Sequence, residues 1–247
     1  MRRIIITGGP TNEPIDEVMK ITNMSTGKLS VALAGLFLRA GYSVCLILNN
    51  SVNASELSGS GAEVVRIETT DDMFEALKAQ SMRVDHVDAI IHAAAVGDYG
   101  AGFSFLLEDM AEELFAKMKD VKAVGDILKI MEDPECKLDD SSKISSYQKN
   151  LTVKLSLTTK IIAHLRDWYP ESLLIGCKLL DNVSKEELFG AAAHLCGKNR
   201  IDYVLANDLA ELREGKTARY LVDQSGYTGI ILEKPEDIYK FINGACL

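Results

Sequence analysis

Two segments near the start of the chain, Thr7-Gly8-Gly9-Pro10-Thr11-Asn12-Glu13-Pro14 and Ile21-Thr22-Asn23-Met24-Ser25-Thr26-Gly27, lie between an apolar strand and an apolar helix. The strand is predicted at residues 3–6, and the helix is predicted from apolar residues that recur at helical spacing over residues 29–40. Gly41 follows as a residue suited to end the helix. The connection holds about twenty residues of turn-forming and hydroxyl-bearing sequence, far more than packing requires. We therefore predict that it forms a cradle for a ligand.

The residue types in this connection favour a phosphate-bearing ligand. Gly8 and Gly9, directly after the strand, allow the backbone to approach a ligand closely. Ser25, Thr26 and Gly27 present backbone N–H groups at the start of the helix, and such a helix end attracts phosphate. The alternative is that Gly8 and Gly9 only turn the chain and Ser25 only caps the helix. The length and composition of the connection favour the cradle.

The length and composition of the chain limit the classes of protein to which it can belong. The chain has 247 residues, of which 47% are hydrophobic and 26% charged, as in globular proteins. This is long enough for one large α/β domain, and we predict a single domain over residues 1–247. No apolar run approaches the ~20 residues of a membrane span, so we expect no membrane partner. Because a core strand begins almost at the N-terminus, we expect no cleavable signal and a cytoplasmic location.

Charge and side-chain spacing exclude several kinds of site. The net charge of −9 argues against a nucleic-acid partner, which would need clustered Lys and Arg. The five cysteines are scattered and form no Cys-x-x-Cys pair, so we predict reduced, mostly buried thiols and no zinc site. The four histidines show no ligand spacing. His92 lies in an apolar strand and is interpreted as a core histidine.

The rest of the chain alternates between strand and helix patterns. Strands are predicted at 43–48, 64–67, 88–92, 173–177 and 203–206, and helices from Thr69, at 160–168 and at 184–198. This alternation predicts an α/β fold with a doubly wound, mostly parallel, Rossmann-like sheet. The alternation stops over residues 100–150, which predicts an inserted flap with a helix near 106–118. A hairpin of 219–222 with 228–232 and a helix from Pro235 complete the fold.

In such a sheet, ligands bind beyond the carboxyl ends of the strands, near the point where strand order reverses. Four predicted loops leave these ends, at residues 8–27, 93–99, 176–180 and 206–208. Each carries small or polar residues, and each alone could be an ordinary turn. Their common location favours a joint site.

A dinucleotide-dependent dehydrogenase is the first nucleotide chemistry to consider for this fold. The Gly-x-Gly-x-x-Gly spacing is absent, and Asn49-Asn50 ends the second strand where an acidic residue would bond the ribose of NAD. No tyrosine is followed four residues later by lysine, the pair common in short-chain reductases. Hydride transfer is therefore the minor alternative.

The loop motifs resemble those of a known family. Residues 8–16 together with 21–27 are similar to the signature of phosphopantothenoylcysteine synthetase, the phosphopantothenate–cysteine ligase of coenzyme A biosynthesis. The resemblance continues through residues 94–99, 143–146 and 176–180, and ends with Asp202–Asp208. It covers nearly the whole chain in order. Because no flavin-dependent decarboxylase domain precedes it here, the chain looks like the stand-alone bacterial form.

The resemblance implies a two-step ligation. The carboxylate of 4'-phosphopantothenate attacks the α-phosphate of CTP, giving an acyl-cytidylate and pyrophosphate, and the amine of cysteine then displaces CMP. Backbone N–H groups, lysines and Mg²⁺ must neutralise the repulsion between the carboxylate and the triphosphate. Bacterial members use CTP and eukaryotic members ATP, and likeness to the bacterial form favours CTP. The family usually forms homodimers.

The resemblance also assigns roles to individual residues. It implies that phosphate groups are held by Gly8, Gly9, Pro10, Ser25, Thr26 and Gly27. It makes Asn23 a catalytic residue that contacts the acyl-cytidylate and orients its carbonyl, and Lys143 the catalytic lysine of a mobile loop. It places Asp98 near nucleotide and metal, and Ala94 beside the base. Lys178 and Lys198 are weaker candidates for phosphate contact.

Each of these residues also has a plainer interpretation. Lys143 in a serine-rich run could be a solvated loop lysine, and Asp98 could cap a turn. Two positions depart from the family: Met19 replaces an arginine that most relatives carry, and Cys177 replaces a phenylalanine that many carry. Three functions thus remain open: the CTP-dependent ligase, a nicotinamide-dependent reductase, and a non-catalytic nucleotide-sensing protein.

Overall fold

The computed structural model describes residues 2–84 and 86–246, which divide into two compact units. The first unit comprises Met1–Thr11, Asn23–Val96 and Thr159–Leu247, and the second comprises Asn12–Thr22 and Gly97–Thr158. The predicted flap lies within the second unit. The single domain over residues 1–247 stays a prediction, because a compact unit need not be able to fold alone.

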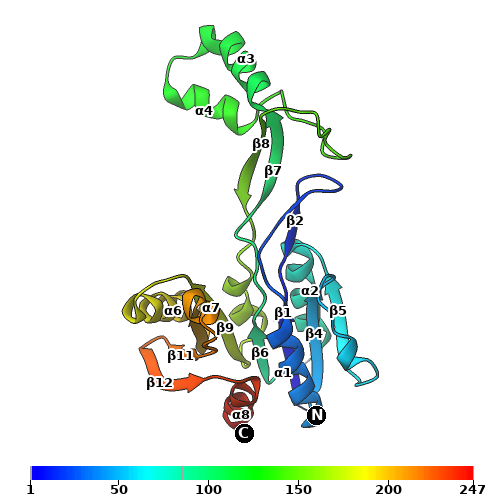
Figure 1. Ribbon diagram of the computed structural model, residues 1–247, viewed down its shortest axis with the longest axis vertical. Coiled ribbons are helices and arrows are strands. Elements are labelled where there is room, and N and C mark those ends of the chain that lie inside the picture. The colour runs from blue at the N-terminus through cyan, green and yellow to red at the C-terminus, as the bar shows by residue number, and fades with distance from the viewer. Residues whose placement is uncertain (1, 85, 247) are drawn as a thin grey trace. The chain divides into compact units, whose positions relative to one another are not determined.

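The first unit is built on an eight-stranded sheet in the order β12-β11-β10-β9-β6-β1-β4-β5 (Figure 1). Its strands are β1 (Arg3–Gly8), β4 (Ser43–Asn49), β5 (Glu63–Ile67), β6 (Ala89–His92), β9 (Leu173–Leu180), β10 (Tyr203–Asp208), β11 (Arg219–Asp223) and β12 (Gly226–Leu232). Neighbours from β5 through β10 are parallel, and β11 and β12 add an antiparallel hairpin at one edge. The predicted doubly wound α/β fold with a C-terminal hairpin is confirmed.

Helices cover both faces of this sheet because its strands are apolar on both sides. Ile4 and Ile6 pack in one core cluster with residues of α1 (Lys28–Arg39) and α8 (Pro235–Ala245). Ile5, between them, packs in a second cluster with residues of α2 (Thr70–Arg83) and α6 (Lys185–Asn199). The shorter helices of this unit are η1 (Ser55–Leu57), η3 (Ile161–Ala163), α5 (Leu165–Trp168) and α7 (Leu209–Arg213).

The strand order reverses between β1 and β6. From β1 the chain proceeds to β4 and β5 on one side, and from β6 it proceeds to β9 and β10 on the other. The carboxyl ends of β1 and β6, at Gly8 and His92, therefore lie side by side with diverging connections. This is the position where open α/β sheets bind ligands.

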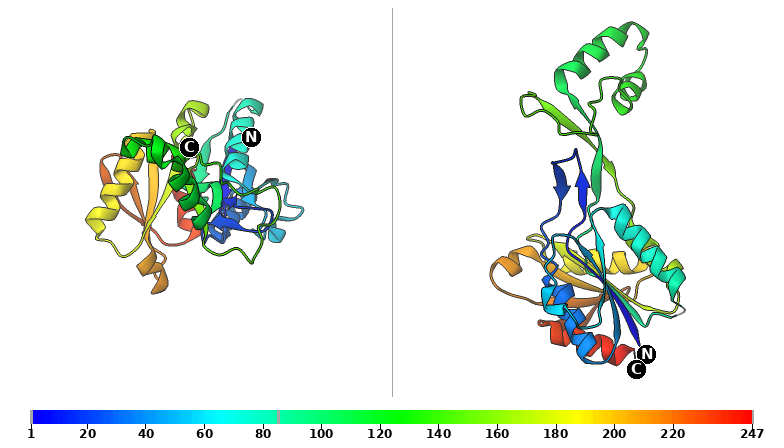
Figure 2. Two further views of the ribbon diagram at one scale, coloured as in Figure 1. Left: turned by 90° about the horizontal axis from the view of Figure 1, so that it is seen from above. Right: turned by 90° about the vertical axis from the view of Figure 1, so that its right-hand side faces the viewer.

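The second unit contains two small antiparallel sheets and two helices (Figure 2). One sheet is the hairpin of β2 (Asn12–Pro14) and β3 (Lys20–Thr22), and the other pairs β7 (Tyr99–Leu106) with β8 (Leu151–Leu157). The helices are α3 (Leu107–Lys117), followed by η2 (Met118–Asp120), and α4 (Val124–Glu132). The helix near 106–118 is confirmed. The β2–β3 hairpin and the β7–β8 pair were not predicted: β2 and β3 have only three residues each, and the apolar–polar alternation of Leu151–Leu157, which indicates a strand, was missed.

Two other sequence predictions were wrong. The segments 176–180 and 206–208 are not loops: β9 and β10 continue through them, with Lys178 opposite Ala206 and Leu180 opposite Asp208. The helix predicted at 160–168 is instead the short η3 followed by α5. In residues 2–84 and 86–246, the structure has no helix that is long and apolar enough to cross a membrane.

Candidate functional site

The ends of β1 and β6 are tied together by side chains. Thr7 Oγ1 lies 2.9 Å from His92 Nδ1 and accepts a hydrogen bond of 3.2 Å from the backbone N of Ala94. Burial lowers the pKa of His92 to about 4, so its ring is neutral at pH 7. The interpretation of His92 as a core histidine is confirmed.

The loops that follow β1 and β6 pair with each other. Pro10 and Ala95 form an isolated parallel bridge, in which Ala95 N donates to Gly9 O at 2.9 Å and Thr11 N donates to Ala95 O at 3.3 Å. Ala94, the predicted neighbour of the base, is partly buried beside this bridge. The structure thus brings Gly8, Gly9, Pro10 and Ala94 together at the point where strand order reverses.

Asn23 joins this group through its side-chain amide. Its Nδ2 donates to the backbone carbonyls of Ala95 at 3.2 Å and Val96 at 3.1 Å. The residue as a whole is exposed to solvent. An amide held at an exposed edge by two neighbouring carbonyls is positioned to contact a ligand there.

The glycines allow segments of the protein to approach one another closely. A Cβ atom on Gly8 would lie 2.3 Å from Ser30 Oγ, the hydroxyl that binds Thr7 O and holds α1 against β1. Gly9 and Gly27 have φ angles of 81° and 67°, and a Cβ on either would lie within 2.7 Å of the Val52 side chain. The glycines therefore fix the shape of the loop as well as keeping its backbone accessible.

The N-cap residue of α1 has no side chain to cap the helix. It is Gly27, in the left-handed conformation, and the hydroxyl of the preceding Thr26 accepts only a long hydrogen bond of 3.5 Å from Lys28 N. The alternative interpretation of Ser25 as the capping residue is therefore wrong. Ser25 is partly buried and Thr26 is exposed. Because α1 follows β1, this helix end lies at the carboxyl edge of the sheet.

The two candidate phosphate-binding lysines lie at opposite edges of the sheet. Lys178 is in the last part of β9, beyond Gly176, which pairs with His92, and so lies at the carboxyl edge. Lys198 is in the last turn of α6, which runs back from β9 toward the start of β10. The structure does not bring Lys198 to the other candidates, because a crossover helix ends at the amino edge of a parallel sheet.

Asp98 and Lys143 belong to the second unit. Asp98 directly precedes β7 and is exposed, and Lys143 is exposed in the run 139–150. Ile144 is the buried residue of this otherwise exposed run, at 7% exposure. The mobility expected for the run stays a prediction, but the run has one anchored point.

Asp16 binds the run at this anchored point, Ile144. The sequence analysis did not single out this residue. Its Oδ1 accepts hydrogen bonds from the backbone N of Met19 at 2.6 Å and of Val18 at 2.7 Å, and its Oδ2 accepts one from Ile144 N at 2.8 Å. These backbone N–H groups lower the pKa of Asp16 below its ordinary value. The signal available in the sequence was an Asp inside the family signature, placed to close a turn.

The two departures from the family have structural consequences. Met19 closes the β2–β3 turn through its backbone carbonyl, which accepts from Ile15 N at 2.8 Å, while its side chain is 37% exposed. The backbone of position 19 closes this turn whatever side chain it carries. Burial raises the pKa of the Cys177 thiol to about 11, so it is a neutral packing group.

The cysteines are less buried than the sequence analysis predicted. All five cysteines are free, with Cys45 and Cys196 buried and the other three partly buried.

Over the described residues, no group of three or more His, Cys, Asp or Glu side chains could hold a metal ion. A magnesium ion that arrives with a nucleotide needs only one or two protein carboxylates, because phosphates and waters supply its other ligands. The exposed Asp98 fits that requirement.

Asn49 ends β4, at the position where a dinucleotide-dependent enzyme has an acidic residue that binds the ribose. Here the asparagine side chain has a structural role. Asn49 Oδ1 accepts from Ser51 N at 2.9 Å and Ser51 Oγ at 2.7 Å, and Asn49 Nδ2 donates to Glu68 O at 3.2 Å. These bonds shape the turn that carries Val52 toward Gly9 and Gly27. The amide of Asn49 is thus committed to the turn, which weakens the dinucleotide alternative.

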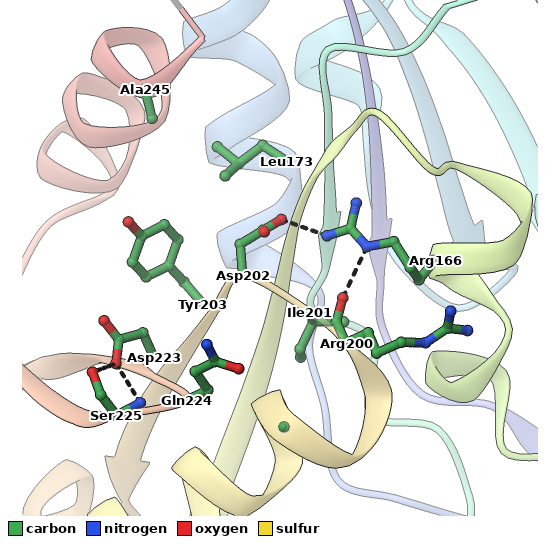
Figure 3. Close-up of a pocket in the computed structure, with 11 residues that line it drawn as sticks. Arg166, Leu173, Arg200, Ile201, Asp202, Tyr203, Asp223, Gln224, Ser225 and Ala245 are labelled. Carbon is green, nitrogen blue, oxygen red and sulfur yellow. Dashed lines mark hydrogen bonds and ion pairs between the residues drawn. The ribbon is translucent and has the colours of Figure 1, made fainter.

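A pocket of about 680 Å³ lies at the opposite edge of the sheet (Figure 3). It is lined by Leu173 and Tyr203, which begin β9 and β10, and by Arg166, whose guanidinium pairs with Asp202 at 2.8 Å. Arg200, which also lines it, pairs with Asp167. Both arginines of this pocket are paired, so it does not have the character of an anion site.

Comparisons with known proteins agree with this geometry. Residues 1–104 match the family model described as DNA/pantothenate metabolism flavoprotein C-terminal domain. The Coenzyme A biosynthesis bifunctional protein CoaBC of Thermococcus kodakarensis is 29% identical over 208 residues, 84% of this chain and 41% of that protein. CoaBC of Vibrio parahaemolyticus is 41% identical over 98 residues, 40% of this chain and 23% of that protein. The chain thus spans less than half the length of these relatives.

Solved structures match over almost the whole chain. The DNA/pantothenate metabolism flavoprotein from Streptococcus pneumoniae has a TM-score of 0.79 and 27% identity, covering 99% of this chain and 98% of that one. A Cab2 variant in complex with phosphopantothenate-cysteine shares the fold, with a TM-score of 0.65, 14% identity and coverage of 99% and 86%. Sequence and fold together confirm the resemblance predicted from the sequence: residues 1–104 match the model of the DNA/pantothenate metabolism flavoprotein C-terminal domain, and the whole fold is similar to that of the pneumococcal flavoprotein.

Proposed function

We propose that this protein joins 4'-phosphopantothenate to cysteine, consuming CTP, as a step of coenzyme A biosynthesis. The observation that carries the proposal is the docking of the Asn23 amide on the loop after β6, beside the glycine turn after β1 and the start of α1, whose N-cap residue is a glycine. The relationship to the CoaBC proteins and to the pneumococcal flavoprotein supports the same function. The Cab2 complex adds support, because that protein of the same fold binds phosphopantothenate-cysteine.

The first step needs a site for the triphosphate. The N–H groups at the start of α1, with Ser25, Thr26 and Gly27, and the backbone N–H groups of Gly8 and Gly9 provide donors for phosphate oxygens, while Pro10, which has no N–H, shapes the turn. Lys178 at the same edge of the sheet supplies positive charge, and Asp98 is the proposed carboxylate for Mg²⁺. When bound, Mg²⁺ neutralises phosphate charge. The carboxylate oxygen of phosphopantothenate can then bond to the α-phosphorus, and pyrophosphate leaves.

The second step depends on Asn23. The amine of cysteine attacks the acyl carbon, its nitrogen forms the new amide bond, and CMP leaves with the electrons of the broken acyl–oxygen bond. Negative charge develops on the acyl oxygen during this attack, and a neutral amide donor stabilises it without adding charge. Because Asn23 Nδ2 already donates to Ala95 O and Val96 O, stabilising the oxyanion requires it to exchange one of these carbonyls for the substrate oxygen.

Lys143 is the proposed catalytic lysine, supplied by the second unit. An ammonium group near the phosphates would stabilise charge on the leaving group, and ordering of its loop would exclude water that hydrolyses the acyl-cytidylate.

A homodimer is the proposed assembly. Its support is a set of exposed apolar side chains on α3 and α4: Phe115 is 82% exposed, Val124 is 82% exposed and Leu128 is 53% exposed. Apolar residues clustered on helix faces in this way are typical of protein–protein contact surfaces.

Ligand-dependent stabilisation tests the nucleotide assignment. CTP with Mg²⁺ should raise the melting temperature, because a ligand at about a hundred times its Kd stabilises the native state by roughly 2.7 kcal/mol. NADH and NADPH serve as matched controls for the dinucleotide alternative and should leave the melting temperature unchanged. A shift with NADPH and none with CTP would overturn the proposal in favour of a nicotinamide-dependent reductase.

A further inference from the structure

One buried carboxylate connects two distant segments of the second unit. Asp16 is 6% exposed and accepts backbone hydrogen bonds from its own turn and from Ile144, which is 128 residues away in the sequence. The two carboxylate oxygens of Asp16 accept hydrogen bonds from different segments. Oδ1 closes the β2–β3 turn at Val18 and Met19, and Oδ2 holds Ile144.

The contact with Ile144 is the fixed point of the exposed run 139–150. The Ile144 side chain is buried, while its neighbours on both sides are exposed. A hydrogen bond from a backbone N–H to an ionised carboxylate is stronger than one between neutral groups. The backbone at position 144 is therefore held by a charge-assisted bond and by apolar burial together.

Lys143 is the residue directly before this fixed point. Its side chain is exposed, so it can move, but its backbone is bonded to a residue attached to the Asp16 carboxylate. We propose that Asp16 is the positioning residue of Lys143, holding the lysine loop to the β2–β3 turn through Oδ2. This inference rests on the proposed function only in assigning Lys143 a catalytic role.

A purely local role for Asp16 predicts a different behaviour. If the carboxylate only closed its turn, then Oδ1 alone would matter, and Asp16→Asn would be silent because the asparagine amide retains an acceptor oxygen there. In the positioning role, Asp16→Asn places an N–H₂ donor against the N–H of Ile144 and breaks that contact. Asp139→Asn is a matched control, because Asp139 lies in the same run but bonds only locally, to Ser141 N at 2.9 Å.

Limited trypsin digestion tests the contact without requiring any ligase activity. Cleavage after Lys143 should be at least about tenfold faster in Asp16→Asn than in the wild type or in Asp139→Asn, because loss of the bond opens the loop. Hydrogen exchange provides a second measurement on the unmodified protein: the amide of Ile144 should exchange more slowly than those of the neighbouring residues. Equal cleavage in all three proteins, or an unprotected Ile144 amide, would overturn the proposal.

Ligase kinetics test whether the contact acts through Lys143. In Asp16→Asn, kcat should fall by about tenfold or more with little change in the KM for CTP, and adding this substitution to Lys143→Ala should cost little further. Independent, multiplicative losses in the double variant would overturn the coupling. If the wild type shows no ligase activity, the proposed function fails, while the digestion result still decides whether Asp16 holds the loop.

Discussion

The two units of this protein differ in how they are held together. The first unit buries strands on both faces in two core clusters, and residues such as Ile4, Ile5 and Leu33 are 0% exposed. The second unit has narrow sheets and helices with much apolar surface exposed, and α4 has no buried residue among those described. Its long-range order depends more on polar contacts such as Asp16 to Ile144. The difference teaches that the proposed nucleotide cradle is built on rigid strand ends, whereas Lys143 is carried on a less tightly packed support.

The largest expected effect concerns the rigid cradle. Asn23→Asp places a negative charge where an amide donor is needed, and loss of one oriented donor typically lowers the rate by roughly 10²–10³-fold. Product formation should fall by this factor, whereas CTP binding, measured by titration calorimetry, should change little. Normal turnover of Asn23→Asp would remove this residue from the site.

A matched pair of leucines compares the packing of the two units. Leu33→Ala, at a fully buried position of α1, should lower the free energy of unfolding by about 2–5 kcal/mol. Leu128→Ala, at a 53% exposed position of α4, should change it by less than about 0.5 kcal/mol. Chemical denaturation measures both. Equal costs would contradict the difference in packing described for the two units.

The pH dependence of stability should report on the first unit through His92. Its pKa is about 4 in the folded protein, against 6.5 for an unperturbed histidine, so the unfolded state binds the proton more readily. Stability should therefore fall as the pH drops from about 6.5 toward 4, by up to about 3 kcal/mol. In His92→Gln, which cannot titrate, this part of the pH dependence should disappear. An unchanged slope would show that His92 is not buried as a neutral ring.

The smallest effect on folding is expected at the exposed helices of the second unit. Phe115→Ser should leave the free energy of unfolding within about 0.5 kcal/mol of the wild-type value, since the side chain is 82% exposed. The same substitution should weaken self-association, measured by sedimentation velocity, if this surface forms the proposed homodimer. A dimer of unchanged affinity would place the interface elsewhere.

The first unit was predictable from sequence because its strands are continuous apolar runs separated by helical periodicity. Strand ends were less predictable: polar residues such as Lys178 and Asp208 continue β9 and β10 through backbone pairing, which apolar patterns do not reveal. In the second unit, β2 and β3 are three residues long and carry little periodic signal, whereas β8 alternates apolar and polar residues over Leu151–Leu157, a strand pattern that the sequence analysis did not use. The common location of the loops after β1 and β6 followed from fold logic and family resemblance, but their pairing at Pro10 and Ala95 did not.

How well each residue of the candidate site could be predicted also depends on whether its contacts are encoded in a local sequence pattern. Asn23 and the glycines lie in local motifs that sequence comparison recognises. Asp16 acts through a bond to Ile144 across 128 residues, and no local pattern encodes such a partner. Lys198 was a weaker candidate implied by the family resemblance, but the direction of α6 places it at the other edge of the sheet.

Release of pyrophosphate tests the central claim most directly. The protein is incubated with 4'-phosphopantothenate, cysteine, Mg²⁺ and either CTP or ATP, and both pyrophosphate and the amide product are measured. We predict pyrophosphate and product in equal amounts with CTP, at a higher rate than with ATP, and no product when cysteine is omitted. Absence of pyrophosphate and product with every nucleoside triphosphate, from a protein that is folded and binds CTP, would contradict the account and favour a non-catalytic nucleotide-binding role.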